Sequence, residues 1–202
     1  MTDRPLDLQA GARSLRIAVL DATHVHAYKA LRDAALHDAP EAFTSDHASA
    51  VHRPAESYAG RFGPPPSGTF FLGAFDSATG ELLGSIGCER EERLQQRHCA
   101  HVVGMMVSTA AQRRGIGREL LRECLRLAGQ VEGPEQLLLT VTAVNGHSVR
   151  LYESEGFRPW GLLPRAIVVA GIAYDKLHMV RPLHSALQAD APAPPELRSN
   201  AK

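Results

Sequence analysis

The sequence lacks a net charge. Its 22 Lys and Arg side chains balance 22 Asp and Glu side chains over 202 residues. Domains that bind nucleic acid or an anionic membrane usually carry a basic excess, so we expect neither partner. The chain also lacks any apolar run near the roughly 20 residues that cross a bilayer. Its first residues, MTDRPLDLQAGARS, contain no apolar stretch of the kind found in a secretory signal.

Cysteine is scarce as well. Cys88, Cys99 and Cys124 form an odd, widely spaced set, typical of reduced thiols rather than of a disulfide framework. We therefore expect a cytoplasmic protein. His98, Cys99 and His101 invite a metal site, but alternation along a strand puts His98 on the face opposite to the other two. Because zinc needs three or four converging ligands, we expect no metal.

What is present is an ordinary globular composition, 44% hydrophobic and 22% charged, in a chain long enough for one domain. We expect a flexible leader over 1–14, the domain over 15–183, and a disordered tail rich in Ala and Pro over 184–202. Periodicity and turn residues predict the order β-α-α-β-β-β-α-β-α followed by closing strands, an α/β or α+β fold. The predicted strands cover 14–20, 69–75, 81–89, 98–107, 136–144, 157–163, 166–171 and 172–181, and the predicted helices cover 23–36, 54–62, 116–129 and 146–155.

The segment QRRGIG, residues 112–117, lies between a predicted strand and a predicted helix. Backbone N–H groups at a helix N-terminus, together with two arginines, favour a phosphate ligand. A Walker A loop would require a Lys-Ser or Lys-Thr pair, which is missing here. The dinucleotide fingerprint G-x-G-x-x-G fails at Leu120, where its third glycine would stand. The pattern Q/R-x-x-G-x-G/A fits in full.

This last pattern resembles the pyrophosphate loop of the GNAT superfamily of acetyl-coenzyme A-dependent N-acetyltransferases. The preceding VSTAAQ resembles the family's V-x-P-x-x-Q/R, with Thr109 in place of proline. NGHSVRLYESEGF, residues 145–157, resembles N-x-x-A-x-x-L-Y-E-x-x-G-F, and YDKLHMVRPL resembles the last strand of many members. The resemblance covers about residues 15–183. It implies a mixed, mostly antiparallel twisted sheet flanked by helices, in which two splayed parallel strands form a cofactor wedge.

The resemblance also implies acetyl-coenzyme A as co-substrate. The N–H groups of residues 113–118 would wrap its pyrophosphate, and Gly115 and Gly117 would permit close approach and positive φ. The end of the strand at 101–107 would line the pantetheine; the alternative is that the methionine pair in it is core, as one of the two must be, since strand neighbours face opposite ways. The expected cofactor contacts are Met105, Met106, Val107, Gln112, Arg113, Arg114, Gly115, Ile116, Gly117, Arg118, Asn145, Ser148 and Tyr152.

Two residues are candidates for proton transfer. Tyr152 matches the tyrosine that protonates the leaving coenzyme A sulfur in similar members, and its alternative role is packing in the core. The ribosomal-protein alanine acetyltransferases carry a glutamate at the position of Thr140, which cannot act as a base. The histone acetyltransferase register instead indicates His101, since an imidazole titrates near neutrality. The alternative is that His101 is a strand residue bonded to its neighbours; Glu41 and Glu89 are weaker candidates for the base.

The acceptor is expected to be an amine. The resemblance implies that residues 37–62 and 164–175 wall its cleft, where Glu41, Phe43 and Asp46 could receive a cationic amine beside an apolar group. The first hypothesis is an N-acetyltransferase that acts on a small-molecule or peptide amine. The second is a non-catalytic acetyl-coenzyme A-binding module on the same scaffold. A homodimer stays open.

Overall fold

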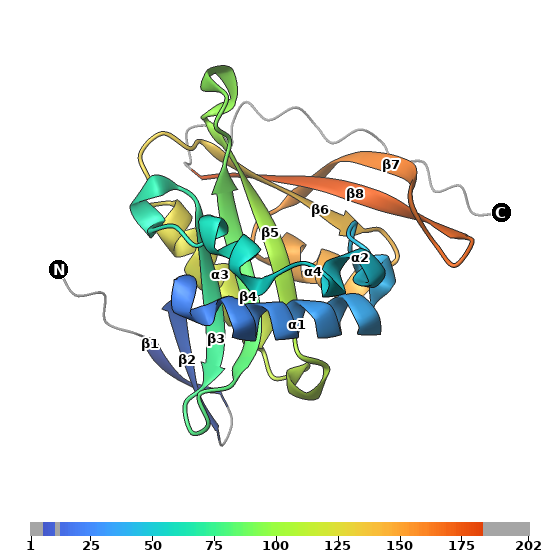
Figure 1. The fold of residues 1–202 in the computed structure, drawn as a ribbon. Helices are drawn as coiled ribbons and strands as arrows, with labels where there is room; N and C mark the ends of the chain where they lie inside the picture. The colour runs from blue at the N-terminus through green and yellow to red at the C-terminus, as the bar shows by residue number, and fades with distance from the viewer. Residues whose placement is uncertain (1–5, 11–12, 184–202) are drawn as a thin grey trace.

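The computed structural model describes residues 6–10 and 13–183, with side chains from residue 15 onward. Its eight strands form one sheet with helices on both faces (Figure 1). The strands are β1 Leu6–Ala10, β2 Arg13–Val19, β3 Phe70–Asp76, β4 Leu82–Arg90, β5 Cys99–Val107, β6 Gln136–Thr142, β7 Arg158–Val169 and β8 Ile172–Pro182. The α-helices are α1 Val25–Asp38, α2 His47–Val51, α3 Ile116–Ala128 and α4 Gly146–Ser154. Short 3-10 helices include η2 Pro40–Ala42, η3 Ala55–Arg61, η5 Leu94–Gln96 and η6 Thr109–Ala111.

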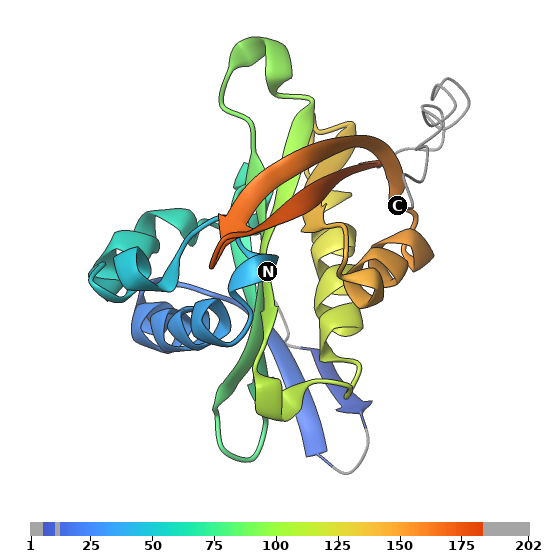
Figure 2. The same ribbon diagram turned by 90° about the vertical axis from the view of Figure 1, so that its right-hand side faces the viewer.

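The strand order is β1-β2-β3-β4-β5-β6-β8-β7, and β5 and β6 are the parallel pair. All other neighbouring strands in the described sheet are antiparallel. Helices α1 and α2 cover one face of the sheet, whereas α3 and α4 cover the other (Figure 2). The predicted fold class, a mixed and mostly antiparallel sheet flanked by helices, is confirmed.

The parallel pair splays apart soon after it forms. Strands β5 and β6 share only three register pairs, the last of which joins His101 to Leu138. Beyond this point β5 remains paired with β4, and β6 remains paired with β8. The facing edges of β5 and β6 therefore lack each other's backbone hydrogen bonds, and a wedge opens between them.

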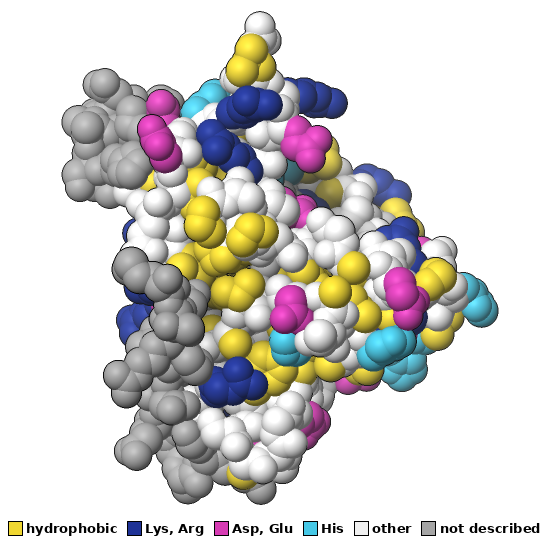
Figure 3. Space-filling model, turned by 60° about the vertical axis from the view of Figure 1, so that its left-hand side comes forward, with side chains coloured by type: hydrophobic (Ala, Val, Ile, Leu, Met, Phe, Trp, Pro, Cys, Tyr) yellow, Lys and Arg dark blue, Asp and Glu magenta, His cyan; other side chains and the backbone are white. Residues whose placement is uncertain are grey.

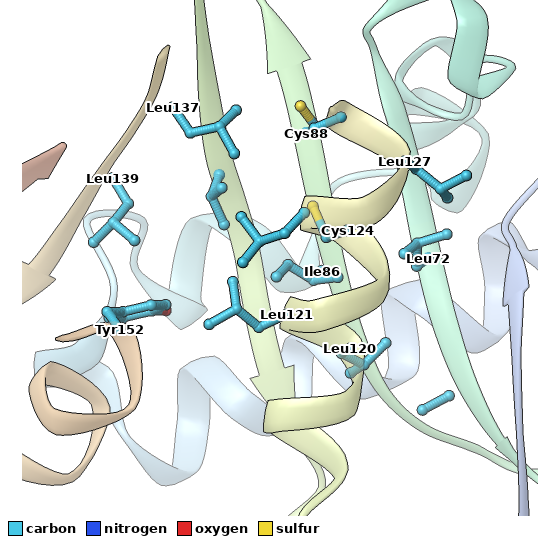
Figure 4. Close-up of a cluster of buried hydrophobic side chains, with 14 of the residues drawn as sticks. Leu72, Ile86, Cys88, Leu120, Leu121, Cys124, Leu127, Leu137, Leu139 and Tyr152 are labelled. Atoms are coloured by element: carbon cyan, nitrogen blue, oxygen red, sulfur yellow. The ribbon is translucent and has the colours of Figure 1, made fainter. Parts of the chain in front are cut away.

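The main core lies between the sheet and α3. The helix buries one continuous face, as its apolar spacing predicts, with Leu120, Leu121 and Cys124 fully enclosed. These side chains meet Ile86, Cys88 and Leu137 from the sheet (Figure 4). Burying each large apolar side chain contributes roughly 1.5–3 kcal/mol. The helix that follows the QRRGIG loop is thus held rigidly against the strands.

A second cluster lies on the α1 face of the sheet. Tyr28 of α1 packs edge-on against Phe71 of β3, with ring centroids 5.6 Å apart, and against Tyr58 of η3 at 5.3 Å. Such tilted aromatic pairs are favoured by the ring quadrupole. This cluster fixes α1 and η3 over β3, β4 and β5.

Several elements differ from the prediction. Strand β1 pairs with β2 inside the segment predicted as a leader, and α2 lies in a segment for which neither a helix nor a strand was predicted. The two predicted strands at 157–163 and 166–171 are one strand, β7. It continues through a bulge at Leu163–Ile167, which accommodates Pro164 within the strand. The helix predicted at 54–62 is the 3-10 helix η3. The predicted tail at 184–202 lies outside the described residues.

The surface and the cysteines agree with the composition. On the face in Figure 3, basic and acidic side chains are interspersed rather than gathered by sign. Cys88, Cys99 and Cys124 are buried free thiols. The pKa of the Cys124 thiol is raised well above its ordinary value. The largest cause is a hydrogen bond with Cys88, and the next is burial. In the part of the chain that the structure describes, no helix is long and apolar enough to cross a membrane.

Candidate functional site

A slot of about 750 Å³ lies where five elements meet: the end of α1, η2, the end of β5, the QRRGIG loop and the start of α4. It gathers most of the residues predicted to contact a cofactor. Its walls also include residues that the sequence analysis did not single out. The lining residues are Ala35, Asp38, Ala39, Ala42, Phe43, Met105, Met106, Val107, Thr109, Ala111, Gln112, Arg113, Gly115, Ile116, Gly117, Arg118, Asn145, His147, Ser148, Arg150 and Leu151.

The slot has two chemically different ends. Arg113 from the loop, Arg118 from α3 and Arg150 from α4 make one end cationic, and His147 of α4 lies with them. Apolar groups from η2 and β5 dominate the other end, which reaches the wedge. The slot therefore suits an elongated ligand that is anionic at one end and apolar at the other.

The start of α3 carries no side-chain cap. Its N-cap residue is Gly115, at φ +78°, and no side chain bonds to the first turn. The N–H groups of Ile116 and Gly117 have no acceptor within the helix, because the first turn of an α-helix lacks preceding carbonyls. Arg113 is also left-handed, at φ +61°, which is uncommon outside glycine. The loop thus keeps backbone donors and the positive end of the helix dipole facing the slot.

The two glycines of the loop have different roles. Gly115 needs its positive φ, whereas Gly117 lies within α3 and is not among the positive-φ residues, so the prediction of positive φ there was wrong. A Cβ built on Gly117 would lie 3.1 Å from Cε of Met105 and 3.7 Å from Cδ2 of Leu151. Since both neighbours line the slot, Gly117 provides space rather than backbone freedom.

The strand leading to the loop is tied to α1. Thr109, which stands where the family pattern has proline, donates a hydrogen bond to Oδ2 of Asp38 at 2.7 Å. Hydrogen bonds from His37 and from Thr109 lower the pKa of the Asp38 carboxyl. The rim of the slot is therefore closed by a contact between residues 71 positions apart.

A bulge in β5 sets which side chains face each way. From Gly87↔Val103 to Ser85↔Met106, β5 advances by one residue more than β4. Gly104 lies within the bulge and has a φ of +60°. Its carbonyl oxygen accepts a hydrogen bond from the buried Ser85 hydroxyl at 3.0 Å. As a result, Met105 packs toward α3 and Met106 joins the cluster on the α1 face. A bulge leaves backbone groups unpaired in the ladder.

His101 lies on β5 at the last register pair before the wedge. Its Nε2 lies 3.1 Å from Oε1 of Glu91, and the imidazole is 39% exposed. The side chain lines a second cavity, of about 650 Å³, on the other side of the bulge from the slot. Arg61 and Glu89, joined at 2.7 Å, also line this cavity. The cavity therefore holds charged side chains of both signs.

Thr140 has an unexpected partner on the neighbouring strand β8. Its hydroxyl lies 3.2 Å from Nδ1 of His178 on β8. The His178 ring in turn packs against Trp160 of β7, with centroids 5.3 Å apart. Strands β6, β8 and β7 thus place the half-exposed imidazole of His178 beside Thr140, which has no carboxylate.

Tyr152 is held in the core. Its side chain is 7% exposed, packs edge-on to Phe157 at 5.9 Å, and does not line the slot. Figure 4 shows the ring beside Leu139 of β6, with its hydroxyl end turned toward Leu121 of α3. Burial is the main cause that raises the pKa of this phenol far above its ordinary value. The tyrosine is therefore protonated at neutral pH.

Asn145 begins α4 in the way its residue type favours. Its Oδ1 accepts a hydrogen bond from the Ser148 amide at 3.1 Å, which caps the helix. The cap directs the first turn of α4 into the slot, so that His147 and Arg150 line it together with Asn145 and Ser148. Helical spacing from Asn145 could have indicated His147 and Arg150, whereas nothing local indicates Asp38 or Ala42.

The remaining predicted residues differ in whether their side chains line the slot. Arg114 does not line the slot, and the side chain of Ile116 is buried in the core. Phe43 lines the slot, while Asp46 caps α2 by accepting a bond from the Ser49 amide at 2.7 Å. Within residues 15–183, no group of three or more His, Cys, Asp or Glu side chains could hold a metal ion.

Comparisons with known proteins agree on one family. The sequence model of the acetyltransferase (GNAT) family matches residues 28–157. Over 73 residues the chain is 34% identical to "Putative phosphinothricin acetyltransferase YwnH" of Bacillus subtilis (strain 168), a match that spans 36% of this chain and only 44% of that protein.

Solved structures are similar over most of the fold. One is a GNAT superfamily phosphinothricin acetyltransferase from Sinorhizobium meliloti in complex with AcCoA, with a TM-score of 0.73 at 18% identity over 90% of this chain and 94% of that chain. Another is a GCN5-related N-acetyltransferase from Kribbella flavida, with a TM-score of 0.69 at 25% identity over 83% of this chain and 97% of that chain. Since the family model covers well over half of the sequence, and the splayed strands, the loop and the capped α4 all lie within it, this chain belongs to the acetyltransferase (GNAT) family.

Proposed function

We propose that this protein is an N-acetyltransferase that moves an acetyl group from acetyl-coenzyme A directly to a primary amine. The observation that carries the proposal is the slot, which joins an uncapped, cationic helix start to the open edge of a splayed strand pair. Acetyl-coenzyme A supplies the reactive thioester carbonyl. Its form, an anionic nucleotide joined to a long and less polar pantetheine, matches the two ends of the slot.

The loop would hold the pyrophosphate. The N–H groups at the start of α3 and the side chains of Arg113 and Arg118 face this end of the slot. Bonds from N–H groups to a charged acceptor contribute about 1.5–3 kcal/mol each. His147 and Arg150 would add charge at the same end. Gln112 and Asn145 would complete the contacts at its rim.

The wedge would hold the pantetheine as an added strand. Beyond His101 the edge of β5 that faces β6 is unpaired, and extended ligands bind such edges through main-chain hydrogen bonds. The bulge at Gly104 leaves further backbone groups free at the narrow end of the wedge. We propose that these groups polarise the acetyl carbonyl, because preorganised N–H donors stabilise a developing oxyanion.

His101 is our proposed general base. It lines the second cavity, which lies on the other side of the β5 bulge from the cofactor slot, so an amine in that cavity would approach the wedge past the imidazole. Glu91 holds Nε2 and would stabilise the imidazolium after proton transfer. An acceptor amine is mostly protonated at neutral pH, so a base must remove one proton before attack.

Tyr152 is our proposed general acid for the leaving thiolate. Burial raises its pKa, so the phenol keeps its proton at neutral pH. The same shift makes the phenol a weaker acid, so a preorganised hydrogen bond to the sulfur would have to offset it. It follows directly after Leu151 on α4, which lines the slot. The phenol packs between β6 and α3 (Figure 4) and does not line the slot. The acid therefore stays shielded from solvent.

The relatives' names suggest where to look for the acceptor. Two of them are named for phosphinothricin, a small amine that also carries acidic groups. The second cavity combines carboxylates with Arg61, Arg90 and Arg93, which suits an amine of this kind. We propose that the acceptor is a small amine that carries charges of both signs, in preference to a peptide amine. We also propose a cytoplasmic location, since buried free thiols persist in reducing compartments.

The test is an assay of thiol release from acetyl-coenzyme A across a panel of amines, with phosphinothricin, amino acids, polyamines and peptides. Amine-dependent release, with acetylated product seen by mass spectrometry, is the expected result. Tight binding of acetyl-coenzyme A without release for any amine would favour a non-catalytic binding module. Absence of binding would refute the proposal.

A further inference from the structure

A lysine is buried between the sheet and the wall of the slot. Lys176 of β8 is 5% exposed and lies opposite Thr142 in the β6–β8 register. Its Nζ donates to Oγ1 of Thr142 at 2.8 Å and to the carbonyl oxygen of Ala42 at 3.1 Å. The Thr142 hydroxyl donates in turn to the carbonyl oxygen of Glu41 at 2.6 Å. Two side chains thus hold two consecutive carbonyls of η2.

This arrangement is costly for a cation. A buried ammonium is unfavourable unless it is paired or well bonded. Among the described residues no carboxylate forms an ion pair with Lys176 within 4.0 Å. Burial lowers the pKa of this lysine, and the nearby charge of Glu41 opposes the shift. An apolar residue would fill the position at lower cost, so the bonds to η2 are the feature that distinguishes the lysine.

The tethered turn forms one wall of the slot. Ala42, whose carbonyl Lys176 binds, lines the slot together with the next residue, Phe43. Phe43 packs against the cluster that contains Met106 of β5, so this part of the wall is apolar. The cationic end is formed by other elements, the QRRGIG loop and α4. The tether therefore acts on one end of the slot only.

We propose that Lys176, with Thr142, is a positioning residue that fixes η2 against the wedge and thereby sets how tightly the slot holds the pantetheine part of its ligand. This inference rests on the proposed function. It assigns no contact between Lys176 and the ligand. The nucleotide part binds at the other end of the slot and should be insensitive to the tether.

The test compares two ligands by calorimetry. One is acetyl-coenzyme A, and the other is adenosine 3′-phosphate 5′-diphosphate, the nucleotide part of coenzyme A without pantetheine. Lys176→Met keeps the length of the side chain and removes its donors. We expect the Kd for acetyl-coenzyme A to rise about tenfold. This change corresponds to the free energy of roughly one hydrogen bond to a charged group. The Kd for the nucleotide should stay within about twofold of wild type.

Lys29 provides a matched control. Its Nζ also bonds a neighbouring segment through carbonyls, those of Ala50 and Val51 on α2, but α2 does not line the slot. Lys29→Met should lower the melting temperature while leaving the Kd values of both ligands unchanged. Thr142→Val, which removes the bridge to Glu41, should repeat the selective loss and serves if Lys176→Met does not fold.

The outcomes separate the two proposals. Equal loss of affinity for both ligands, or no loss for either, in Lys176→Met and Thr142→Val would overturn the positioning role. Faster hydrogen exchange at the amides of residues 41–43 should accompany the selective loss. If the wild-type protein binds neither the nucleotide nor acetyl-coenzyme A, the proposed function itself fails.

Discussion

Gly117→Val tests the loop through a change whose effect on folding is small. A Cβ at this position meets only the mobile Cε of Met105 at 3.1 Å, and the other neighbours lie at ordinary contact distance. Valine is also a better helix residue than glycine by a few tenths of a kcal/mol. These terms nearly cancel, so the free energy of unfolding should change by less than about 1 kcal/mol.

Ligand binding should respond much more strongly. The methyl groups that Gly117→Val introduces would project between Met105 and Leu151, into the space next to the first N–H groups of α3. Loss of one bond from such a donor to a phosphate removes about 1.5–3 kcal/mol, which raises the Kd for acetyl-coenzyme A roughly 10- to 150-fold. Calorimetry with the pure protein measures this directly.

The control is the same substitution at a glycine outside the slot. A Cβ at Gly161 of β7 meets no atom within 4 Å, and Gly161 does not line the slot. Gly161→Val should bind acetyl-coenzyme A as wild type does. If Gly117→Val folds and binds acetyl-coenzyme A with wild-type affinity, the loop does not hold the phosphates and the assignment of the slot is wrong.

Three further outcomes concern proton transfer. Tyr152→Phe should lower kcat by about ten- to a thousand-fold with little change in the Kd of acetyl-coenzyme A; unchanged kcat would make Tyr152 a packing residue. His101→Gln should remove the acidic limb of the pH profile of kcat/KM, and retention of both limb and rate would make His101 structural. Burial raises the pKa of Tyr152 above its unfolded value, so its contribution to stability is complete below pH ~10 and is lost as the pH rises beyond that. In an alkaline titration followed by phenolate absorbance, Tyr152→Phe should therefore remove amplitude from the latest phase only.

The features that depend on local sequence could be predicted. Apolar spacing defines the buried face of α3, and Asn145 caps α4 as its side chain favours. The QRRGIG loop identifies the cationic end of the slot because a helix start without a side-chain cap retains its donors. These features require no knowledge of what lies across the sheet.

The bulge in β5 could not be predicted from alternation. The pattern of CAHVVGMMV fits a regular strand, and only the register against β4 shows that one residue is extra. Gly104 was the available signal, since a glycine inside a strand often marks a bulge. The consequence is that Met105, rather than Met106, faces α3.

The contacts between distant segments could not be predicted either. Glu91 beside His101, His178 beside Thr140, and Lys176 beside Ala42 each depend on how strands and turns meet in the folded chain. The second of these pairs is notable because it places an imidazole next to the residue where related enzymes carry a glutamate. Sequence spacing alone gives no register between β6 and β8.

The most direct test of the account is a calorimetric titration of the wild-type protein with acetyl-coenzyme A, ATP and NAD. The account predicts saturable binding of acetyl-coenzyme A at one site per chain, because the slot joins a phosphate-binding helix start to an open strand edge. ATP and NAD lack the pantetheine that would fill the wedge and should bind far more weakly. Binding of ATP or NAD as tight as that of acetyl-coenzyme A would contradict the account.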